Sequence, residues 1–241
     1  MKNTNEIYYN KNKCLIAGEV LIDWSAKAGC TTVVQMVFKK LGILKMALDY
    51  HPTGWVHDFR DERYYNMYKH KDDSLYFKDP NIKKIKFVRN PYNRAVSSYI
   101  HLNRTKLRDL VPEKNLTFEE FLTLMKHKRI VDNPHWGYQC RQGEINSYNN
   151  GKSFYDRVVK IEQFPEVLDS LSDIIKLEPV KYDTHHVVYE TEQTGYAGNV
   201  NWDKIRNNLP SPGAFYNEYT IDLVKEVYKY DLMLYKYEHV D

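Results

Sequence analysis

A turn rich in small residues contains the first group of side chains that could bind an anion. The strand-like run Val20–Trp24 leads into residues 25–30, and Thr31 and Thr32 begin a helix-like pattern. Small side chains let the backbone approach a ligand closely, and the first N–H groups of a helix have no intrahelical acceptor, so they can hold a phosphate. Lys27 adds a positive charge, and both threonine hydroxyls are further donors. The turn therefore predicts a phosphate-binding site.

The order of residues in this turn differs from the GxxxxGK[ST] loop of nucleotide kinases. In that loop the lysine follows the glycines and the next hydroxyl binds magnesium, whereas here Lys27 precedes Gly29 and Cys30 precedes the threonines. We therefore expect a phosphate loop that uses no metal. The alternative for the turn alone is a tight connection between strand and helix, with the lysine in solvent.

A second turn has the same order of strand, polar turn and helix. Arg89 follows residues 85–88, which read as a strand, and Asn90 has the side chain of a helix N-cap. Ser97 lies on the helix that follows, where its hydroxyl can bind an anion together with the Arg89 guanidinium. Taken singly, each side chain fits a surface role better, Arg89 in an ion pair and Ser97 as a hydroxyl on the helix surface. Because the carboxyl ends of parallel strands share one edge of a sheet, Arg89 and Lys27 are expected to face one crevice and to bind a ligand with phosphates at both ends.

An α/β framework is needed to position these turns. Strands and helices alternate along the chain, which favours a central parallel sheet flanked by helices, with a phosphate-binding turn of the P-loop kind. Because no linker or repeat divides the sequence, we expect a single domain over residues 1–241. The expected strands are 20–24, 85–88 and 158–161; the expected helices are 31–42, 62–71, 118–125, 165–177, 221–230 and one that starts at Pro91; the expected loops are the rest of 46–80 and 132–140.

The composition excludes several classes of protein. The 241 residues include 35 Lys+Arg and 32 Asp+Glu, so the net charge of +3 gives a mixed surface rather than a coat for nucleic acid. A hydrophobic fraction of 42% excludes global disorder. Since the sequence has neither an apolar run of ~18 residues nor a secretory signal, we expect a soluble protein without a membrane anchor. Three widely spaced cysteines with no CxxC pair favour the reducing cytoplasm.

The two turns, SAKAGCTT and FVRNPYNRAVSSY, resemble the cofactor signatures of sulfotransferases that use 3′-phosphoadenosine-5′-phosphosulfate (PAPS). The order of TFEEFL, the His135-Trp136 pair and Cys140 is similar to that of Golgi carbohydrate sulfotransferases of the chondroitin/dermatan 4-O type, in sulfotransferase family 2. The resemblance runs from about residue 20 to residue 237. It implies a sulfotransferase fold and transfer of a sulfuryl group to a carbohydrate hydroxyl, with 3′,5′-adenosine bisphosphate (PAP) as the product.

This resemblance implies two sets of cofactor ligands. The set for the 5′-phosphosulfate is Lys27, Ala28, Gly29, Cys30, Thr31 and Thr32, and the set for the 3′-phosphate is Arg89 and Ser97. The sequence departs from the family pattern at Ala26, where proline is usual, and at Asn90, where an acidic residue or histidine is common. Neither change removes a hydrogen-bond donor. Cys140 lacks the second cysteine that accompanies it in Golgi members, which puts a secretory location in doubt.

Sulfuryl transfer to a hydroxyl requires a base for the acceptor proton and a cation for the departing phosphate. Lys27 is the expected cation. An imidazole, with a pKa of ~6.5, suits the base. His57 lies between the two turns, as a histidine does in related carbohydrate sulfotransferases, and is slightly preferred to His135, which would then position the acceptor. Trp136 either stacks on a sugar ring or anchors its loop in the core.

Two other functions fit the same turns. A phosphate-loop kinase acting on a nucleotide or sugar would need magnesium, and Asp23 is the nearest acidic ligand. A non-catalytic module would bind a nucleotide or a sulfated glycan in the same cradle without transferring a group. The sequence does not specify the oligomeric state.

Overall fold

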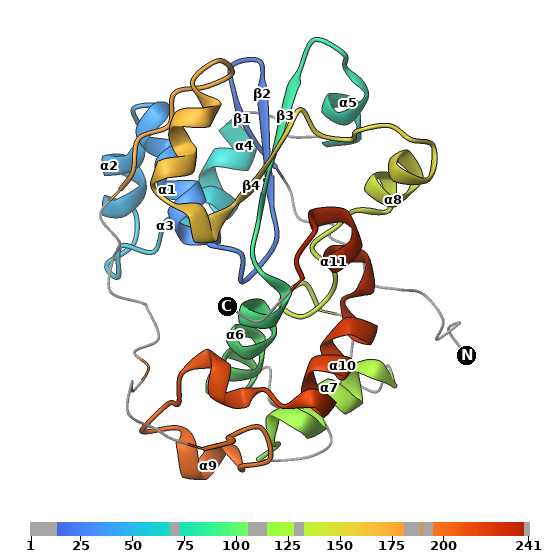
Figure 1. Ribbon diagram of the computed structural model, residues 1–241. Helices are drawn as coiled ribbons and strands as arrows, with labels where there is room; N and C mark the ends of the chain where they lie inside the picture. Colours follow the sequence, from blue (N-terminus) through green and yellow to red (C-terminus); the bar gives the residue numbers. More distant parts are fainter. Residues whose placement is uncertain are drawn as a thin grey trace, which may run out of the picture. The chain divides into compact units, whose positions relative to one another are not determined.

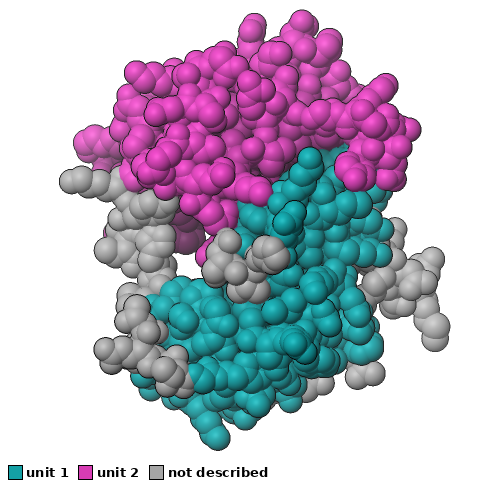
Figure 2. Space-filling model, in the orientation of Figure 1, with its two compact units in different colours: residues 1–10, 90–145, 184–241 teal, residues 11–89, 146–183 magenta. Residues whose placement is uncertain are grey.

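The computed structural model of the protein describes residues 14–67, 73–105, 115–127, 133–180, 189 and 195–238. The described parts of residues 90–145 and 184–241 belong to one compact unit, unit 1, and those of residues 11–89 and 146–183 to another, unit 2 (Figure 2). Each unit therefore combines separate stretches of the chain. The single domain over residues 1–241 stays a prediction.

Unit 2 contains a four-stranded sheet in the order β1-β2-β3-β4 (Figure 1). Its strands are β1 (Leu15–Ala17), β2 (Val20–Trp24), β3 (Lys83–Val88) and β4 (Arg157–Lys160). β1 is antiparallel to β2, whereas β2 pairs with β3, and β3 with β4, in parallel. The predicted α/β class and the three parallel strands are confirmed. β1 makes the sheet mixed rather than purely parallel, and its three residues are too few for an alternating pattern to reveal.

One face of the sheet packs against the helices of unit 2. Because side chains alternate along a strand, the buried core residues occur at every second position. They are Leu15, Ala17, Val20, Ile22, Trp24, Ile85, Phe87 and Val159. They share a core with α1 (Cys30–Lys40), α2 (Leu44–Asp49) and α3 (Val56–Phe59), which lie on one side of the sheet in Figure 1. This packing holds the start of α1 at the carboxyl end of β2.

The other face of β2 and β3 carries a buried ion pair. Asp23 and Lys86 are direct neighbours in the parallel register, and Lys86 Nζ lies 2.8 Å from Asp23 Oδ2 with both side chains fully buried. The Tyr155 hydroxyl donates a hydrogen bond to the same oxygen at 2.5 Å. Asp23 is the carboxylate that the kinase alternative requires as a magnesium ligand. In the structure it instead binds Lys86 of β3 and Tyr155, which lies two residues before β4.

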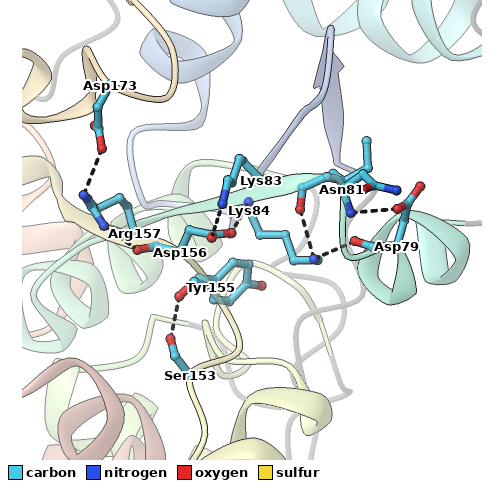
Figure 3. Close-up of polar contacts among 10 residues, drawn as sticks. Asp79, Asn81, Lys83, Lys84, Ser153, Tyr155, Asp156, Arg157 and Asp173 are labelled. Atoms are coloured by element: carbon cyan, nitrogen blue, oxygen red, sulfur yellow. Dashed lines mark hydrogen bonds and ion pairs between the residues drawn. The ribbon is translucent and has the colours of Figure 1, made fainter.

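A second polar cluster fixes the amino ends of β3 and β4 (Figure 3). The Lys84 N–H donates to Asp156 Oδ2 at 2.8 Å, and Lys83 Nζ lies 3.4 Å from the other oxygen. Burial alone would raise the pKa of Asp156, but these two partners lower it overall. Arg157, at the start of β4, reaches Asp173 at 3.1 Å. The register of the two strands is thus set at the end opposite to the predicted anion turns.

In unit 2, the predicted loops around a single helix in 46–80 and the predicted length of the helix over 165–177 are wrong. Residues 46–80 hold more than one helix: α2 and α3, a π-helical segment Arg60–Tyr64, α4 (Tyr65–Met67) and α5 (Asp73–Lys78). The predicted helix over 62–71 falls on part of this run, and its residues 68–71 lie outside the described residues. The predicted helix over 165–177 forms only the 3-10 helix Glu166–Leu171. Its apolar residues recur every three to four positions, a spacing that also packs a 3-10 helix against a sheet.

Unit 1 is helical in its described part. α6 (Pro91–Arg104) begins as predicted, since the Asn90 side chain accepts a hydrogen bond from the Tyr92 N–H at 3.0 Å. The predicted capping box of Thr117 and Glu120 begins α7 (Phe118–Lys126). The remaining helices are α8 (Gln142–Asn149), which continues into unit 2, α9 (Trp202–Ile205), the 3-10 helix Pro212–Phe215, α10 (Glu218–Val227) and α11 (Lys229–Tyr235). The predicted last helix, 221–230, is therefore two helices that meet at Tyr228.

Removing the positive charge from the buried ion pair is expected to destabilise the protein strongly. Lys86→Met keeps much of the side-chain volume but leaves the Asp23 carboxylate buried without its cation, which costs about 3–5 kcal/mol. Urea unfolding followed by circular dichroism measures the loss. Lys45→Ala, which breaks an exposed ion pair with Asp49, is the control and should cost under about 1 kcal/mol. Equal losses in the two variants would contradict the assignment.

Candidate anion-binding site

The first predicted turn is a left-handed bend that ends at α1. Lys27 has a φ of 64° and Gly29 a φ of 69°, and Gly29 is the N-cap of α1. A β carbon on Gly29 would lie 3.2 Å from Ile161 Cδ1, so this position needs glycine for its backbone conformation and has little room for a side chain. A non-glycine residue at positive φ costs about 1–3 kcal/mol, and such strain clusters at binding sites. Lys27 is such a residue.

The start of α1 presents donors and no acidic side chain. The Val33 N–H donates the first backbone hydrogen bond of the helix, to the Gly29 carbonyl at 3.0 Å. The preceding N–H groups, of Cys30, Thr31 and Thr32, therefore have no acceptor in the helix. Since the first turn contains no acidic residue, the helix dipole and these N–H groups favour an anion. Both threonines are partly exposed.

The structure brings the second turn into contact with the first. Arg89 follows β3 at the same edge of the sheet, and its Nη1 donates to the carbonyl oxygen of Lys27 at 3.2 Å. The expected proximity of Arg89 to the first turn is therefore confirmed, and both lie in unit 2, whereas Asn90 and α6 belong to unit 1. This hydrogen bond holds the Arg89 guanidinium beside the turn that leads to the first N–H groups of α1. Binding of a phosphate by these residues stays a prediction.

Two polar residues of α6, Ser97 and Arg94, differ in their burial. Ser97 is partly exposed on α6, in unit 1, and its pairing with Arg89 stays a prediction. Arg94 is fully buried and donates to the carbonyls of Gly137 and Pro134 at 2.7 and 3.2 Å. Arg94 therefore holds the loop of residues 133–140 against α6.

Trp136 lies inside unit 1, so the predicted stacking on a sugar ring is wrong. Its side chain is 4% exposed and belongs to the hydrophobic core of this unit. The Trp136 carbonyl accepts a hydrogen bond from the Tyr228 hydroxyl at 3.0 Å. Because an indole has a large apolar area, burial of this side chain in the core is more favourable than exposure to solvent. The alternative, a loop anchor, is correct. The loop forms turns as predicted over 133–140, and Asp132 lies outside the described residues.

His135 is partly exposed and has a defined tautomer. The His135 backbone N–H donates to Asn133 Oδ1 at 2.9 Å, and the ring Nδ1 lies 2.7 Å from the same oxygen. A carbonyl oxygen only accepts, so Nδ1 carries the proton and the lone pair of the neutral ring is on Nε2. The ring also stacks on His101, with centroids 4.3 Å apart. If His135 acts as a base, it would therefore accept the proton at Nε2.

His57 directly contacts the predicted cradle. Its side chain is buried in α3, and Nε2 lies 3.0 Å from Thr31 Oγ1 and 3.7 Å from Cys30 Sγ. On the other side of the ring, Arg60 Nη1 donates to Nδ1 at 2.7 Å. Burial, and then the charge of Arg60, lower the pKa of His57 to about 4. Sequence reasoning missed Arg60, although its i,i+3 spacing from His57 in a helical segment could have indicated the contact.

The comparison with known families covers both turns. The model of the sulfotransferase family matches residues 26–238. No curated protein and no solved structure matches the chain. Among the residues that the structure describes, no helix has the length and hydropathy of a membrane span. The cellular location stays a prediction.

Arg94 is expected to stabilise unit 1 rather than to bind a ligand. Arg94→Met leaves two buried carbonyls without their charged donor, which should lower the free energy of unfolding by about 3 kcal/mol. Arg94→Lys keeps the charge but not the forked geometry, so an intermediate loss is expected. Urea unfolding measures both, with Arg206→Ala, an exposed arginine, as a control within about 0.5 kcal/mol of the wild type. A fully stable Arg94→Met variant would exclude this role.

Proposed function

The chain belongs to the sulfotransferase family, and from this we propose that it transfers the sulfuryl group of PAPS to a carbohydrate hydroxyl. The observation that carries the proposal is a family match spanning both turns, together with the contact between the Arg89 guanidinium and the Lys27 carbonyl. The carbohydrate acceptor is supported by the resemblance of the sequence to carbohydrate sulfotransferases of the 4-O type. The buried ring of Trp136 lends it no support.

The donors at the start of α1 suit the 5′ end of PAPS. The N–H groups of the first helical turn, two threonine hydroxyls and the Lys27 ammonium can donate hydrogen bonds to phosphosulfate oxygens. The first turn of α1 contains no carboxylate that would repel the phosphosulfate oxygens. Arg89, with Ser97, would bind the 3′-phosphate, for which a forked guanidinium is well shaped. This set of donors fits a ligand with anionic groups at both ends.

When bound, PAPS supplies an activated sulfuryl group: the acceptor oxygen forms a bond to sulfur while the bond from sulfur to the 5′-phosphate oxygen breaks, which releases PAP. Lys27 would stabilise the negative charge that develops on that phosphate oxygen. The helix N–H groups act in the same direction, because they are already oriented before the reaction. The acceptor hydroxyl loses its proton to a base.

The contacts of the two histidines support different roles. His135 has its lone pair on Nε2, because Nδ1 donates to Asn133. His57 has its lone pair on Nδ1, where it accepts a hydrogen bond from Arg60. We therefore favour His135 as the base, although the sequence slightly favoured His57. An assay for sulfuryl transfer distinguishes these roles from those of a non-catalytic module, which would bind the ligand without transferring a group.

Loss of Lys27 or of Arg89 is expected to weaken PAP binding. Each variant, Lys27→Ala or Arg89→Ala, removes a charged donor, so the dissociation constant should rise about 10- to 100-fold. Isothermal titration calorimetry with PAP measures this rise. Lys40→Ala, an exposed lysine at the far end of α1, removes the same charge away from the turn and should bind PAP like the wild type. A wild-type protein that does not bind millimolar PAP would overturn the proposal.

The wild-type protein is expected to add one sulfuryl group to a carbohydrate acceptor in the presence of PAPS. Mass spectrometry of a panel of glycans with free hydroxyls detects the product. His135→Asn should bind PAP normally and lose at least about 100-fold in kcat, since general base catalysis contributes roughly 10²- to 10⁴-fold. PAP binding by the wild type without transfer to any acceptor would favour the non-catalytic module. A strict requirement for magnesium would favour the kinase.

A further inference from the structure

Four side chains form a continuous hydrogen-bonded chain that ends at the start of α1. Asp61 accepts two hydrogen bonds from Arg60, from Nε to Oδ1 and from Nη2 to Oδ2, both at 2.8 Å. This two-point contact fixes the plane of the guanidinium. The remaining terminal nitrogen of Arg60, Nη1, donates to His57 Nδ1 at 2.7 Å. The His57 ring in turn reaches Thr31 Oγ1 at 3.0 Å.

The arginine at one side of the ring determines the proton at the other side. A guanidinium has donors and no acceptor, so His57 Nδ1 must accept, and the proton of the neutral ring is on Nε2. The Nε2–H then donates to the Thr31 hydroxyl oxygen. The Cys30 sulfur, at 3.7 Å, is the weaker neighbouring partner. The direction of every hydrogen bond in the chain is thereby fixed.

The direction of these bonds has a consequence for the Thr31 hydroxyl. A hydroxyl has one proton, and when its oxygen accepts a hydrogen bond the proton is available for another acceptor. Within a helix a threonine hydroxyl commonly donates to the carbonyl four residues earlier, which here is that of Lys27. That carbonyl accepts a hydrogen bond from Arg89, whereas the Thr31 hydroxyl oxygen lies against His57 Nε2. The arrangement therefore favours donation by Thr31 to an anion at the helix start.

The environment of His57 opposes a role as the base. The ring is buried in a T-shaped contact with Trp55, and the charged or titratable groups that face it are Arg60, Asp61 and Cys30. Burial and the Arg60 charge lower the pKa of His57 to about 4, so the ring stays neutral near pH 7 and is a weak base. Its lone pair is also engaged by Arg60.

We propose that His57 is a positioning residue, which, held by Arg60, orients the hydroxyl proton of Thr31 toward the 5′ group of PAPS. This role deepens the proposed function and rests on it. His57 does not touch the reacting atoms, and it acts through Thr31 alone.

Binding of PAP to a double-mutant cycle tests the proposal. His57→Ala and Thr31→Val should each raise the dissociation constant about 5- to 20-fold, and the double variant should bind no more weakly than the worse single variant, because both changes remove the same hydrogen bond. His57→Gln retains an N–H donor near the position of Nε2, so it should recover most of the affinity that His57→Ala loses. His51→Gln, a change in a histidine of the neighbouring loop that bonds Thr53, is the matched control.

The outcome for His57→Ala separates positioning from base catalysis. If PAP affinity is unchanged while kcat falls, His57 is the base and the proposal is overturned. Independent losses that add in the double variant also overturn it. A wild-type protein that binds no PAP overturns both this proposal and the proposed function.

Nuclear magnetic resonance of the ligand-free protein gives a second readout that does not depend on PAP. In long-range ¹H–¹⁵N spectra of histidine-labelled protein, the resonance absent from His57→Gln identifies His57. We expect a neutral ring protonated on Nε2 from pH 8 down to pH 5, and loss of this single tautomer in Arg60→Met. A ring that titrates near its ordinary pKa, or that carries its proton on Nδ1, would overturn the proposal even where PAP binds.

Discussion

The backbone N–H groups at the start of α1 are the constraint on which the site depends. A helix cannot satisfy its first N–H groups internally, and α1 has neither a capping side chain nor an acidic residue in its first turn. The left-handed residues Lys27 and Gly29 turn the chain so that these groups lie at the carboxyl edge of the parallel strands. These N–H groups have no acceptor within the helix, and an external anion can accept their hydrogen bonds. The neighbouring side chains of Arg89 and His57 are also hydrogen-bond donors, so they favour an anion further.

Each unit contains a buried charged group that holds two of its own segments together. In unit 2, the ion pair of Asp23 and Lys86 joins β2 to β3, the strands that lead into the two turns. In unit 1, Asp231 accepts hydrogen bonds from the N–H groups of Gln139 and Cys140. Burial raises the pKa of Asp231, although the charge of Arg94 and these N–H groups oppose the rise. Buried charges are expensive unless they are paired, so both segments have well-defined positions.

The sequence predicted those features whose physical cause is local. Asn90 and Thr117 cap helices through contacts two or three residues away, and the apolar run Val20–Trp24 is long enough to identify a strand. Trp136 could not be assigned between stacking and burial, because only the tertiary core decides which of the two it does. β1 could not be predicted either, because three residues are too few to show a strand pattern and the strand forms only through its pairing with β2.

The two candidate histidines differ through the partner of a single ring nitrogen. Nδ1 of His57 faces a guanidinium that can only donate, whereas Nδ1 of His135 faces an amide oxygen that can only accept. The proton of the neutral ring is therefore on Nε2 in the first and on Nδ1 in the second. The spacing of Arg60 from His57 could indicate a contact, but the ring nitrogen that each partner faces is visible only in the folded structure. One ring is thus suited to orient a donor and the other to accept a proton, although both are the same residue type. In this chain, the donor or acceptor character of the neighbouring residue distinguishes the role that we propose for His57 from the role that we propose for His135.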